Sequence, residues 1–161
     1  MTQHGHLDPV DFKILGILQE NSRMDTTQIA FKVHKSPTAT TDRIRRLQEK
    51  GYIKRYTAVL DRQLMGRPTL MVAMVKLNSH AASNLGDFSG YMHSLPEIQV
   101  CLQLSGEYDF LLQVAVKDPS EYEHFLNIKL CGLTIVEKVQ SALVLKECKL
   151  DGALPVCENK P

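Results

Sequence analysis

The N-terminal third of the chain contains the segment DTTQIAFKVHKSPTATTDRIRRLQEKG (residues 25–51). Residues 25–28 have the form of a capping box, and Ser36-Pro37 forms a second helix start with Ser36 as the N-cap. Only His34-Lys35 separates the two predicted helices, and Gly51 ends the second. So tight a connection is typical of a helix-turn-helix, whose second helix enters the major groove of DNA.

The second predicted helix and the residues after it are strongly basic. Residues 35–55 contain seven Lys and Arg against two acidic residues. A basic face with short hydroxyl side chains suits phosphate binding together with contacts to base edges. On charge alone a solvated surface helix explains the pattern equally well, and it is the tight turn that favours DNA binding. The candidate DNA contacts are Ser36, Thr38, Ala39, Thr41, Asp42, Arg43, Arg45, Arg46, Lys54 and Arg55.

A further helix and a strand complete the predicted DNA-binding domain. Asp8 and Pro9 start a helix whose apolar stripe ends near Asn21, and Asp11 adds a carboxylate near its positive end. Residues 52–60 are rich in strand formers. A strand there predicts a winged helix, whose hairpin would place Lys54 and Arg55 beside the DNA backbone. We therefore assign residues 1–60 to a winged helix-turn-helix domain and 61–68 to a linker.

The second half alternates strands and helices in the order βαββαβ. Strands are predicted over 69–77, 97–104, 110–116 and 142–145, and helices over about 81–94 and 120–130. This order suits a ferredoxin-like domain with both helices on one face of an antiparallel sheet. The fold class is therefore α+β: an N-terminal winged helix-turn-helix followed by a ferredoxin-like regulatory domain over 69–150, with a tail over 151–161.

The predicted strands are apolar on both faces. In strand 69–77, Leu70, Val72 and Met74 lie on one face while Met71 and Val75 lie on the other. A sheet face open to water would alternate with polar residues. We therefore expect a second copy of the sheet to cover the open face, giving a two-fold homodimer that presents two DNA-reading helices to a pseudo-palindromic site.

The connection between the two central strands carries candidate ligand-binding groups. Free N–H groups near Ser105 and Gly106 could bind a carboxylate, and Asp109 could bind an ammonium group. These are the two charges of an α-amino acid. An ordinary hairpin turn, in which Gly106 supplies a positive φ and Asp109 accepts local backbone hydrogen bonds, explains the same residues and is favoured without further information.

The order and spacing of many residues over the first 66 positions resemble the DNA-binding domain of the Lrp/AsnC family of transcription regulators. The matching residues include Leu7-Asp8, Ile29-Ala30, Ser36-Pro37, Gly51-Tyr52-Ile53 and Tyr56-Thr57-Ala58, and the resemblance continues to about residue 156. It implies a cytoplasmic regulator that binds double-stranded DNA and an amino-acid effector. It also implies a homodimer that assembles into a higher homo-oligomer such as an octamer.

The resemblance assigns residues to the effector site and also shows departures from the family pattern. The implied effector contacts are Leu104, Ser105, Gly106, Tyr108, Asp109 and Ser141. Thr40 and His34 stand where the family has a small aliphatic residue and glycine. We expect Thr40 to bond a carbonyl one turn back, and His34 to occupy a left-handed turn position. Leu133-Thr134-Ile135-Val136 replaces the family's Leu-Pro-Gly-Val, so the pocket's rim differs.

The average composition conceals a difference between the two halves. The chain has 161 residues, is 43% hydrophobic and carries a net charge of only +1. Residues 1–66 contain 11 Lys and Arg against 7 acidic residues, whereas residues 67–161 contain 8 against 11. A basic DNA-binding half and a mildly acidic regulatory half account for the average. No apolar run is long enough for a membrane helix and no signal-peptide pattern occurs, so we expect a cytoplasmic protein.

Other chemistries have little support in the sequence. The four cysteines show no zinc spacing, and we expect Cys101, Cys131 and Cys148 to be buried thiols and Cys157 to be exposed. The scattered histidines predict no metal site, and no cofactor is expected. No nucleophile with a base, paired carboxylates or phosphate loop indicates an enzyme. The alternative function is an effector-independent architectural DNA-binding protein.

Overall fold

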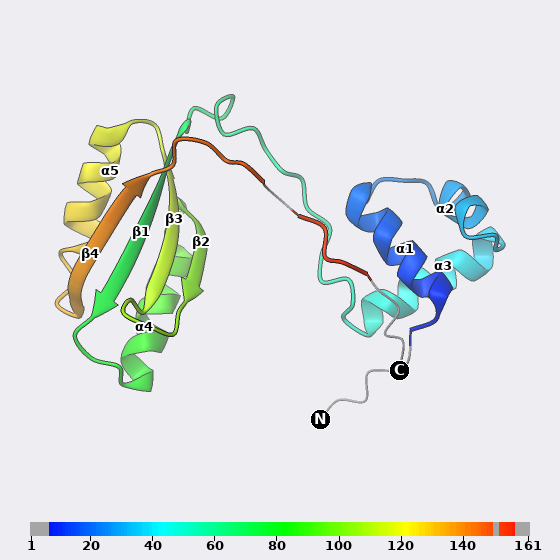
Figure 1. The fold of residues 1–161 in the computed structure, drawn as a ribbon, viewed down its shortest axis with the longest axis horizontal. Helices are drawn as coiled ribbons and strands as arrows, with labels where there is room; N and C mark the ends of the chain where they lie inside the picture. Colours follow the sequence, from blue (N-terminus) through cyan, green and yellow to red (C-terminus); the bar gives the residue numbers. More distant parts are fainter. Residues whose placement is uncertain (1–6, 150–151, 157–161) are drawn as a thin grey trace. The chain divides into compact units, whose positions relative to one another are not determined.

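The computed structural model describes residues 7–149 and 152–156, which form two compact units (Figure 1). The boundaries between the units fall between Ala58 and Val59 and between Cys148 and Lys149. We call the unit that contains the three N-terminal helices the DNA-binding unit, and residues 59–148 the sheet unit. The chain thus passes from the first unit into the second and then returns to the first.

The DNA-binding unit contains three helices: α1 (Pro9–Glu20), α2 (Thr26–Lys32) and α3 (Pro37–Glu49). Each starts at a predicted N-cap, because the side chains of Asp8, Asp25 and Ser36 accept backbone N–H groups of the first turn. The helices enclose a small apolar core of Ile14, Ile29, Val33 and Leu47. The predicted helix-turn-helix is confirmed.

Both departures in this unit behave as expected. His34 has a φ of 53°, in the left-handed region, which lets Lys35 N–H donate to Ala30 O at 3.0 Å and turns the chain sharply after α2. Thr40 is fully buried on the inner face of α3, and its hydroxyl donates to Ser36 O at 3.0 Å. A buried hydroxyl bonded in this way costs the helix little.

The strand predicted over 52–60 is not formed in this structure. No residue between Glu49 and Thr69 lies in a strand, and the residues from Lys54 to Asp61 are exposed. A strand needs a neighbour that takes its backbone hydrogen bonds. Strand-forming side chains alone therefore leave this segment extended, with no hairpin to carry Lys54 and Arg55.

The sheet unit has the predicted βαββαβ order. Its elements are β1 (Thr69–Leu77), α4 (Ala82–Ser94), β2 (Ile98–Gln103), β3 (Phe110–Val116), α5 (Pro119–Phe125) and β4 (Val136–Leu143). The strands are antiparallel in the spatial order β2-β3-β1-β4 (Figure 1), as in a ferredoxin-like fold. A short π-helical turn, Leu126–Leu130, extends α5. The last strand begins six residues earlier than predicted, because polar residues interrupt its pattern.

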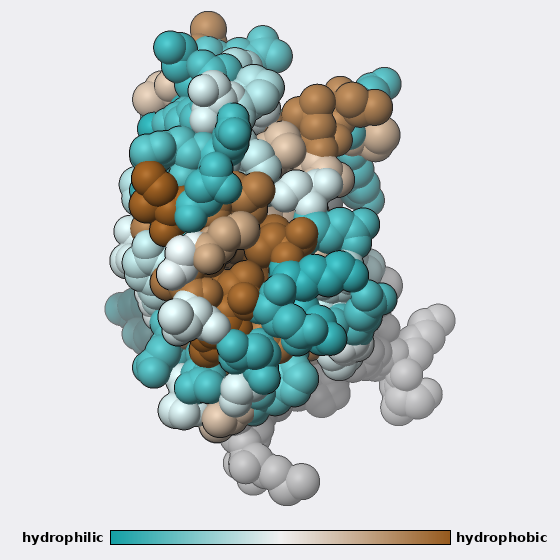
Figure 2. All heavy atoms as spheres, turned by 90° about the vertical axis from the view of Figure 1, so that its left-hand side faces the viewer, coloured by the Kyte–Doolittle hydropathy of each residue, from teal (hydrophilic) through white to brown (hydrophobic). Residues whose placement is uncertain are grey.

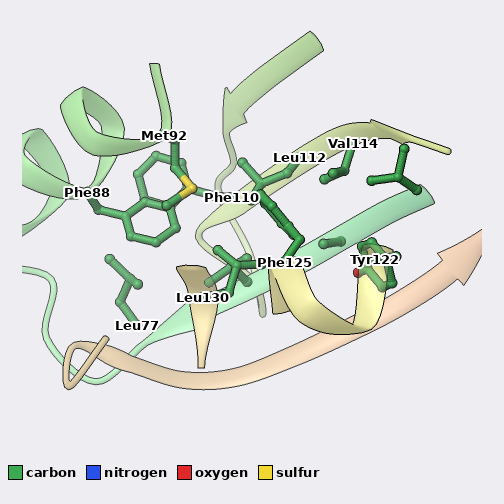
Figure 3. Close-up of a cluster of buried hydrophobic side chains, with 12 residues drawn as sticks. Leu77, Phe88, Met92, Phe110, Leu112, Val114, Tyr122, Phe125 and Leu130 are labelled. Carbon is green, nitrogen blue, oxygen red and sulfur yellow. The ribbon is translucent and has the colours of Figure 1, made fainter. Parts of the chain in front are cut away.

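The core of this unit lies between one face of the sheet and the two helices. Phe88 and Met92 of α4 meet Phe125 of α5 over Phe110 and Leu112 of β3 (Figure 3). The rings of Phe88 and Phe110 are 4.7 Å apart in a tilted arrangement. This packing fixes the ends of β1 and β3, and the connection before β3 carries the candidate effector groups.

No described helix covers the opposite face of the sheet, although Leu70 and Ala115 at one end of it are buried. The less buried residues of β1 and β3 that alternate with the core, and their neighbours in β2, include Val72, Met74, Leu102 and Leu111. Leu102 is 51% exposed. Figure 2 shows a different side, the one on which α5 and β4 lie in Figure 1, and there too hydrophobic side chains gather among hydrophilic ones. The apolar open face anticipated from the sequence is therefore present.

The cysteines differ from the prediction. Cys101 is partly buried in the sheet, and burial raises the pKa of its thiol. Cys131 and Cys148 are exposed, contrary to the expectation of buried thiols. Cys131 is exposed although its neighbour Leu130 is buried in the core, and Cys148 lies beyond β4. Cys157 lies outside the described residues.

Candidate functional site

The outward face of α3 gathers most of the candidate DNA contacts. Thr40 and Leu47 turn inward into the core, which leaves the other side of the helix open. The residues that are exposed there are Ser36, Thr38, Ala39, Thr41, Asp42, Arg45 and Arg46. Two of the hydroxyls already have local roles: Ser36 Oγ caps Ala39 N–H, and Thr41 Oγ1 donates to Pro37 O at 3.0 Å.

Arg45 lies on this face with only weak partners. Its Nη2 is 2.8 Å from Asp42 Oδ1 and its Nε is 4.0 Å from Glu49 Oε1, and all three side chains are more than half exposed. Exposed ion pairs of this kind contribute roughly 1 kcal/mol or less. The guanidinium can therefore exchange these carboxylates for phosphate or base acceptors.

Arg43 and Arg46 are held by carboxylates at the start of α1. Nη1 of Arg43 donates to Asp8 at 2.6 Å and to Asp11 at 2.7 Å, while Nη2 of Arg46 donates to Asp11 Oδ2 at 3.1 Å. The Asp11 side chain is only 3% exposed and that of Arg43 23%. The hydrogen bonds that Arg43 donates to Asp11 and Asp8 raise the pKa of its guanidinium. Arg43, a predicted DNA contact, is thus held by two carboxylates within its own unit.

The two basic residues that follow α3 do not lie in a β-hairpin. Lys54 and Arg55 are exposed in the extended segment after Gly51. They lie close along the chain to the basic end of α3, within the same unit. Their position suits contacts with the phosphates of a DNA duplex that is bound by α3.

The connection between β2 and β3 is a short turn closed by Asp109. Leu104 N–H donates to Asp109 O at 2.8 Å, and Gly106 has a φ of +149°, which L side chains rarely adopt. Ser105 and Gly106 are exposed, and among the described residues their backbone N–H groups have no hydrogen-bond acceptor. These donors can bind a carboxylate.

Both oxygens of the Asp109 carboxylate already have partners. Oδ2 accepts from Leu77 N–H at 2.8 Å, and Oδ1 lies 3.0 Å from His80 Nε2. The Asp109 side chain is 12% exposed, whereas that of His80 is 66% exposed. The carboxylate thus joins the start of β3 to the end of β1, and only the His80 contact is readily displaced by a ligand.

Tyr108 turns away from the helices across β1. Its hydroxyl donates to Gln140 Oε1 at 2.5 Å, and Lys138 Nζ lies 5.3 Å from the centre of its ring. Hydrogen bonding and electrostatic attraction between Tyr108 and Lys138, together with Glu107, raise the pKa of Lys138. In β4 these positions alternate with the core-facing Val139, so Tyr108 belongs to the uncovered side of the sheet.

Ser141 does not join this group within the chain. It pairs with Ala73 of the core-facing set, and its hydroxyl is 2.6 Å from the Tyr122 hydroxyl of α5. Burial raises the pKa of Tyr122. Ser141 therefore contacts the helix side of the sheet, whereas Tyr108 contacts Gln140 and Lys138 on the other side, and the effector role of Ser141 stays a prediction.

Several partners of the site residues have no signal in the sequence. Helix capping explains Asp8 and Asp11 without Arg43, and no sequence feature connects His80 or Gln140 to the ligand turn. Side-chain pairs 32 residues apart have no local signature.

Two family models match the chain in the regions just described. Residues 7–54 match a winged helix-turn-helix DNA-binding domain, and residues 70–154 match the Lrp/AsnC ligand-binding domain. This chain belongs to the Lrp/AsnC family. It is a DNA-binding transcriptional regulator with an amino-acid-binding domain, and this family is not enzymatic.

Individual Lrp/AsnC proteins match over nearly the whole length. The leucine-responsive regulatory protein of Haemophilus influenzae is 34% identical over 143 residues, covering 89% of this chain and 86% of the relative. The Bkd operon transcriptional regulator of Pseudomonas aeruginosa is 34% identical over 150 residues, covering 93% and 98%. A transcriptional regulator of Neisseria meningitidis, solved as a complex with L-Met, is 32% identical with a TM-score of 0.87, covering 93% and 97%.

The described part of the chain shows neither a metal-binding cluster nor a membrane-spanning helix. Among residues 7–149 and 152–156, no group of three or more His, Cys, Asp or Glu side chains is arranged to hold a metal ion. None of the described helices is long and apolar enough to cross a membrane.

Proposed function

We propose that this Lrp/AsnC protein recognises specific DNA sequences through α3 and that an amino-acid effector controls this binding. The observation that carries the first part is the exposed outward face of α3, with Thr38, Thr41 and Arg45 beside one another. The helix is anchored from behind by its inner residues and by the contacts of Arg43 and Arg46 with Asp11. A recognition helix needs both an open face and a rigid base.

The candidate DNA contacts divide into three roles. Thr38, Ala39, Thr41, Asp42 and Arg45 face base edges, with Arg45 as the side chain able to bind guanine through two hydrogen bonds. Ser36, Arg46, Lys54 and Arg55 bind phosphates and set the register of the protein on the duplex. Arg43 positions α3 through Asp8 and Asp11 instead of touching DNA.

The experiment that tests DNA recognition measures affinity against salt concentration. A duplex selected from a random library is titrated with the wild type, with Arg45→Ala and with Lys146→Ala, a control at an exposed lysine of the sheet unit. Several phosphate contacts predict a steep linear loss of log affinity with log salt. Arg45→Ala should lose discrimination among selected duplexes while Lys146→Ala keeps it, and an Arg45→Ala profile equal to the wild type would reject the α3 docking face.

The turn at Leu104–Asp109 is proposed as the effector site. The unpaired N–H groups of Ser105 and Gly106 bind the carboxylate of an amino acid, and Asp109 binds its ammonium group after His80 moves aside. Leu104 and Tyr108 border the ligand, and Ser141 contributes through a neighbouring copy. The L-Met complex of the Neisseria meningitidis regulator, at 32% identity, supports an amino acid as the ligand class. A thermal-shift screen of the twenty amino acids identifies the effector.

A homodimer formed through the uncovered sheet face completes the proposal. Burying Val72, Met74, Leu102 and Leu111 against the same residues of a second copy removes apolar surface from water at about 25 cal/mol per Å2. The two-fold dimer presents two α3 helices to a pseudo-palindromic site, and dimers assemble further, for example into an octamer. The proposed place of action of this DNA-binding regulator is the cytoplasm.

One observation favours a second candidate, an architectural protein without an effector. Both oxygens of Asp109 are already bonded within the chain, so the residue has a structural role whether or not a ligand exists. The amino-acid screen separates the two candidates. A single stabilising amino acid that also changes DNA affinity supports the regulator, whereas no response to any amino acid, together with DNA compaction, supports the architectural protein.

A further inference from the structure

The C-terminal segment 152–156 lies against α1 of the DNA-binding unit. Gln19 forms two hydrogen bonds with the backbone of Leu154: its Nε2 donates to Leu154 O at 3.2 Å, and its Oε1 accepts Leu154 N–H at 2.7 Å. A side-chain amide can donate to the C=O and accept from the N–H of the same residue. The Gln19 amide thus satisfies both backbone groups of Leu154, as an adjacent β-strand would. This contact joins residues 135 positions apart in the sequence.

A second contact on the same face of α1 involves Gly16. Gly16 and Gln19 are three residues apart, so they lie on one side of the helix. A Cβ atom added at Gly16 would lie 3.4 Å from Cγ2 of Val156. This distance is ordinary van der Waals contact, so Val156 packs beside the Gly16 side of α1.

The chain crosses between the two units twice. The chain enters the sheet unit after Ala58 and leaves it after Cys148, and residues from Lys149 onward group with the DNA-binding unit. The DNA-binding unit would have only the linker at 59–68 as its connection if the C-terminal segment were free. Docking on α1 adds a second connection, which leaves the sheet unit after β4, whose last residue Leu143 pairs with Met71 near the start of β1.

We propose that residues 152–156 act as a strap, a segment that docks on the Gly16–Gln19 face of α1 and restrains the DNA-binding unit by this second connection. A unit held by two connections samples fewer orientations than a unit held by one flexible linker. In a dimer, the strap narrows the range of distances between the two α3 helices. The protein then accepts fewer half-site spacings.

Hydrogen exchange tests the docking itself and needs no DNA. In the full chain the Leu154 amide should exchange at least about tenfold more slowly than in an unstructured peptide, because Gln19 accepts its N–H. Gln19→Leu removes both hydrogen bonds at an exposed position and should return the amide to the unstructured rate. Glu20→Leu, a change at the adjacent exposed residue, is the control and should leave the protection intact. An unprotected Leu154 in the wild type, or equal protection in Gln19→Leu, would overturn the strap.

A pair of truncations tests the effect on DNA spacing. Removing residues 152–161 deletes the strap, whereas removing only 157–161 keeps it. Duplexes are selected from a random library by each chain, and the half-site spacings are compared. The strapless chain should accept a wider range of spacings, and identical ranges would overturn the restraint. If no chain selects any duplex, the proposed DNA recognition fails, while the exchange result still decides whether the strap docks.

Discussion

Nη1 of Arg43 on α3 donates a hydrogen bond of 2.7 Å to Oδ1 of Asp11, a buried carboxylate in the first turn of α1. Arg46 binds the same carboxylate from one turn further along α3. Asp8 and Asp11 also form a capping box with each other's backbone N–H groups. The N-terminus of α1 thus serves as the base on which the DNA-reading helix is oriented.

Asp11→Asn should lower the free energy of unfolding of the DNA-binding unit by about 2 kcal/mol. Hydrogen bonds to a charged group contribute stability of this order, and the substitution removes the charge. Urea unfolding followed by circular dichroism measures the change. The matched control is Asp42→Asn, which breaks an exposed pair with Arg45 and should cost roughly 0.5 kcal/mol or less. Equal effects of the two substitutions would show that the contacts of Asp11 add no more stability than an exposed ion pair.

Acid should weaken the anchor through Asp8. Burial raises the pKa of this carboxyl, but hydrogen bonds from Asp11 N–H and Arg43, together with the Arg43 charge, outweigh it and leave the pKa lowered. A carboxyl whose folded pKa is depressed adds stability above its unfolded pKa, and this stability is lost as the pH falls through the folded pKa. Unfolding from pH 7 to pH 3 should show a smaller loss in Asp8→Asn than in the wild type. Parallel curves would contradict this assignment.

His34→Gly should stabilise the protein by about 1 kcal/mol. The residue holds a φ of 53°, and a left-handed backbone costs a non-glycine residue on the order of 1–2 kcal/mol. His34→Val is the opposing variant, since a β-branched residue is strained further at this φ. Thermal melts of the three proteins should rank glycine above histidine above valine. Any other order would indicate that the imidazole itself has a stabilising contact.

Gly106→Ala should disturb the proposed effector turn without unfolding the sheet. A φ of +149° costs an L side chain roughly 1–3 kcal/mol, although a Cβ atom there would meet nothing within 4 Å. The expected result is a weaker calorimetric response to the amino acid found in the screen, with little change in DNA affinity. Gly86→Ala, at a helical glycine that also has open space, should leave the response unchanged. A full response from Gly106→Ala would place the effector elsewhere.

Arg45→Ala should reduce the salt dependence of DNA binding less than removal of a phosphate contact does. A base contact contributes mainly to discrimination, about 1–3 kcal/mol against the wrong base, whereas each phosphate contact adds about one to the salt slope. Lys54→Ala should therefore lower the slope while keeping sequence preference. Exchanged behaviour of the two variants would reverse the roles assigned to α3 and the extended segment.

Local signals were sufficient for the elements of both units. The caps at Asp8, Asp25 and Ser36 act within one helical turn, so the sequence locates the three helix starts. The strand 69–77 contains an uninterrupted apolar run over residues 70–75, and its predicted bounds agree with those of β1. The predicted start of the last strand lies too far along the chain. Glu137, Lys138 and Gln140 occupy exposed positions of the edge strand β4 and interrupt the run of apolar residues by which a strand is recognised.

The candidate site was predicted less completely than the fold. The outward face of α3 follows from helical periodicity, because Thr40 and Leu47 mark its inner side. The use of Arg43 does not follow, since its partners lie on another helix. Likewise, Gly106 signalled a turn, but nothing local showed that Asp109 would accept Leu77 N–H or that Ser141 would face Tyr122.

By itself, the sequence determined the helix-turn-helix, the βαββαβ order, the left-handed turn at His34 and the apolar open face of the sheet. These depend on interactions between near neighbours along the chain and on the periodicity of apolar residues. Only the tertiary structure decided that Arg43 binds Asp11, that residues 52–60 remain without a strand partner, that Cys131 is exposed and that Leu154 returns to Gln19. Each of these depends on which distant segments meet in space, and that is set by the packing of the whole unit.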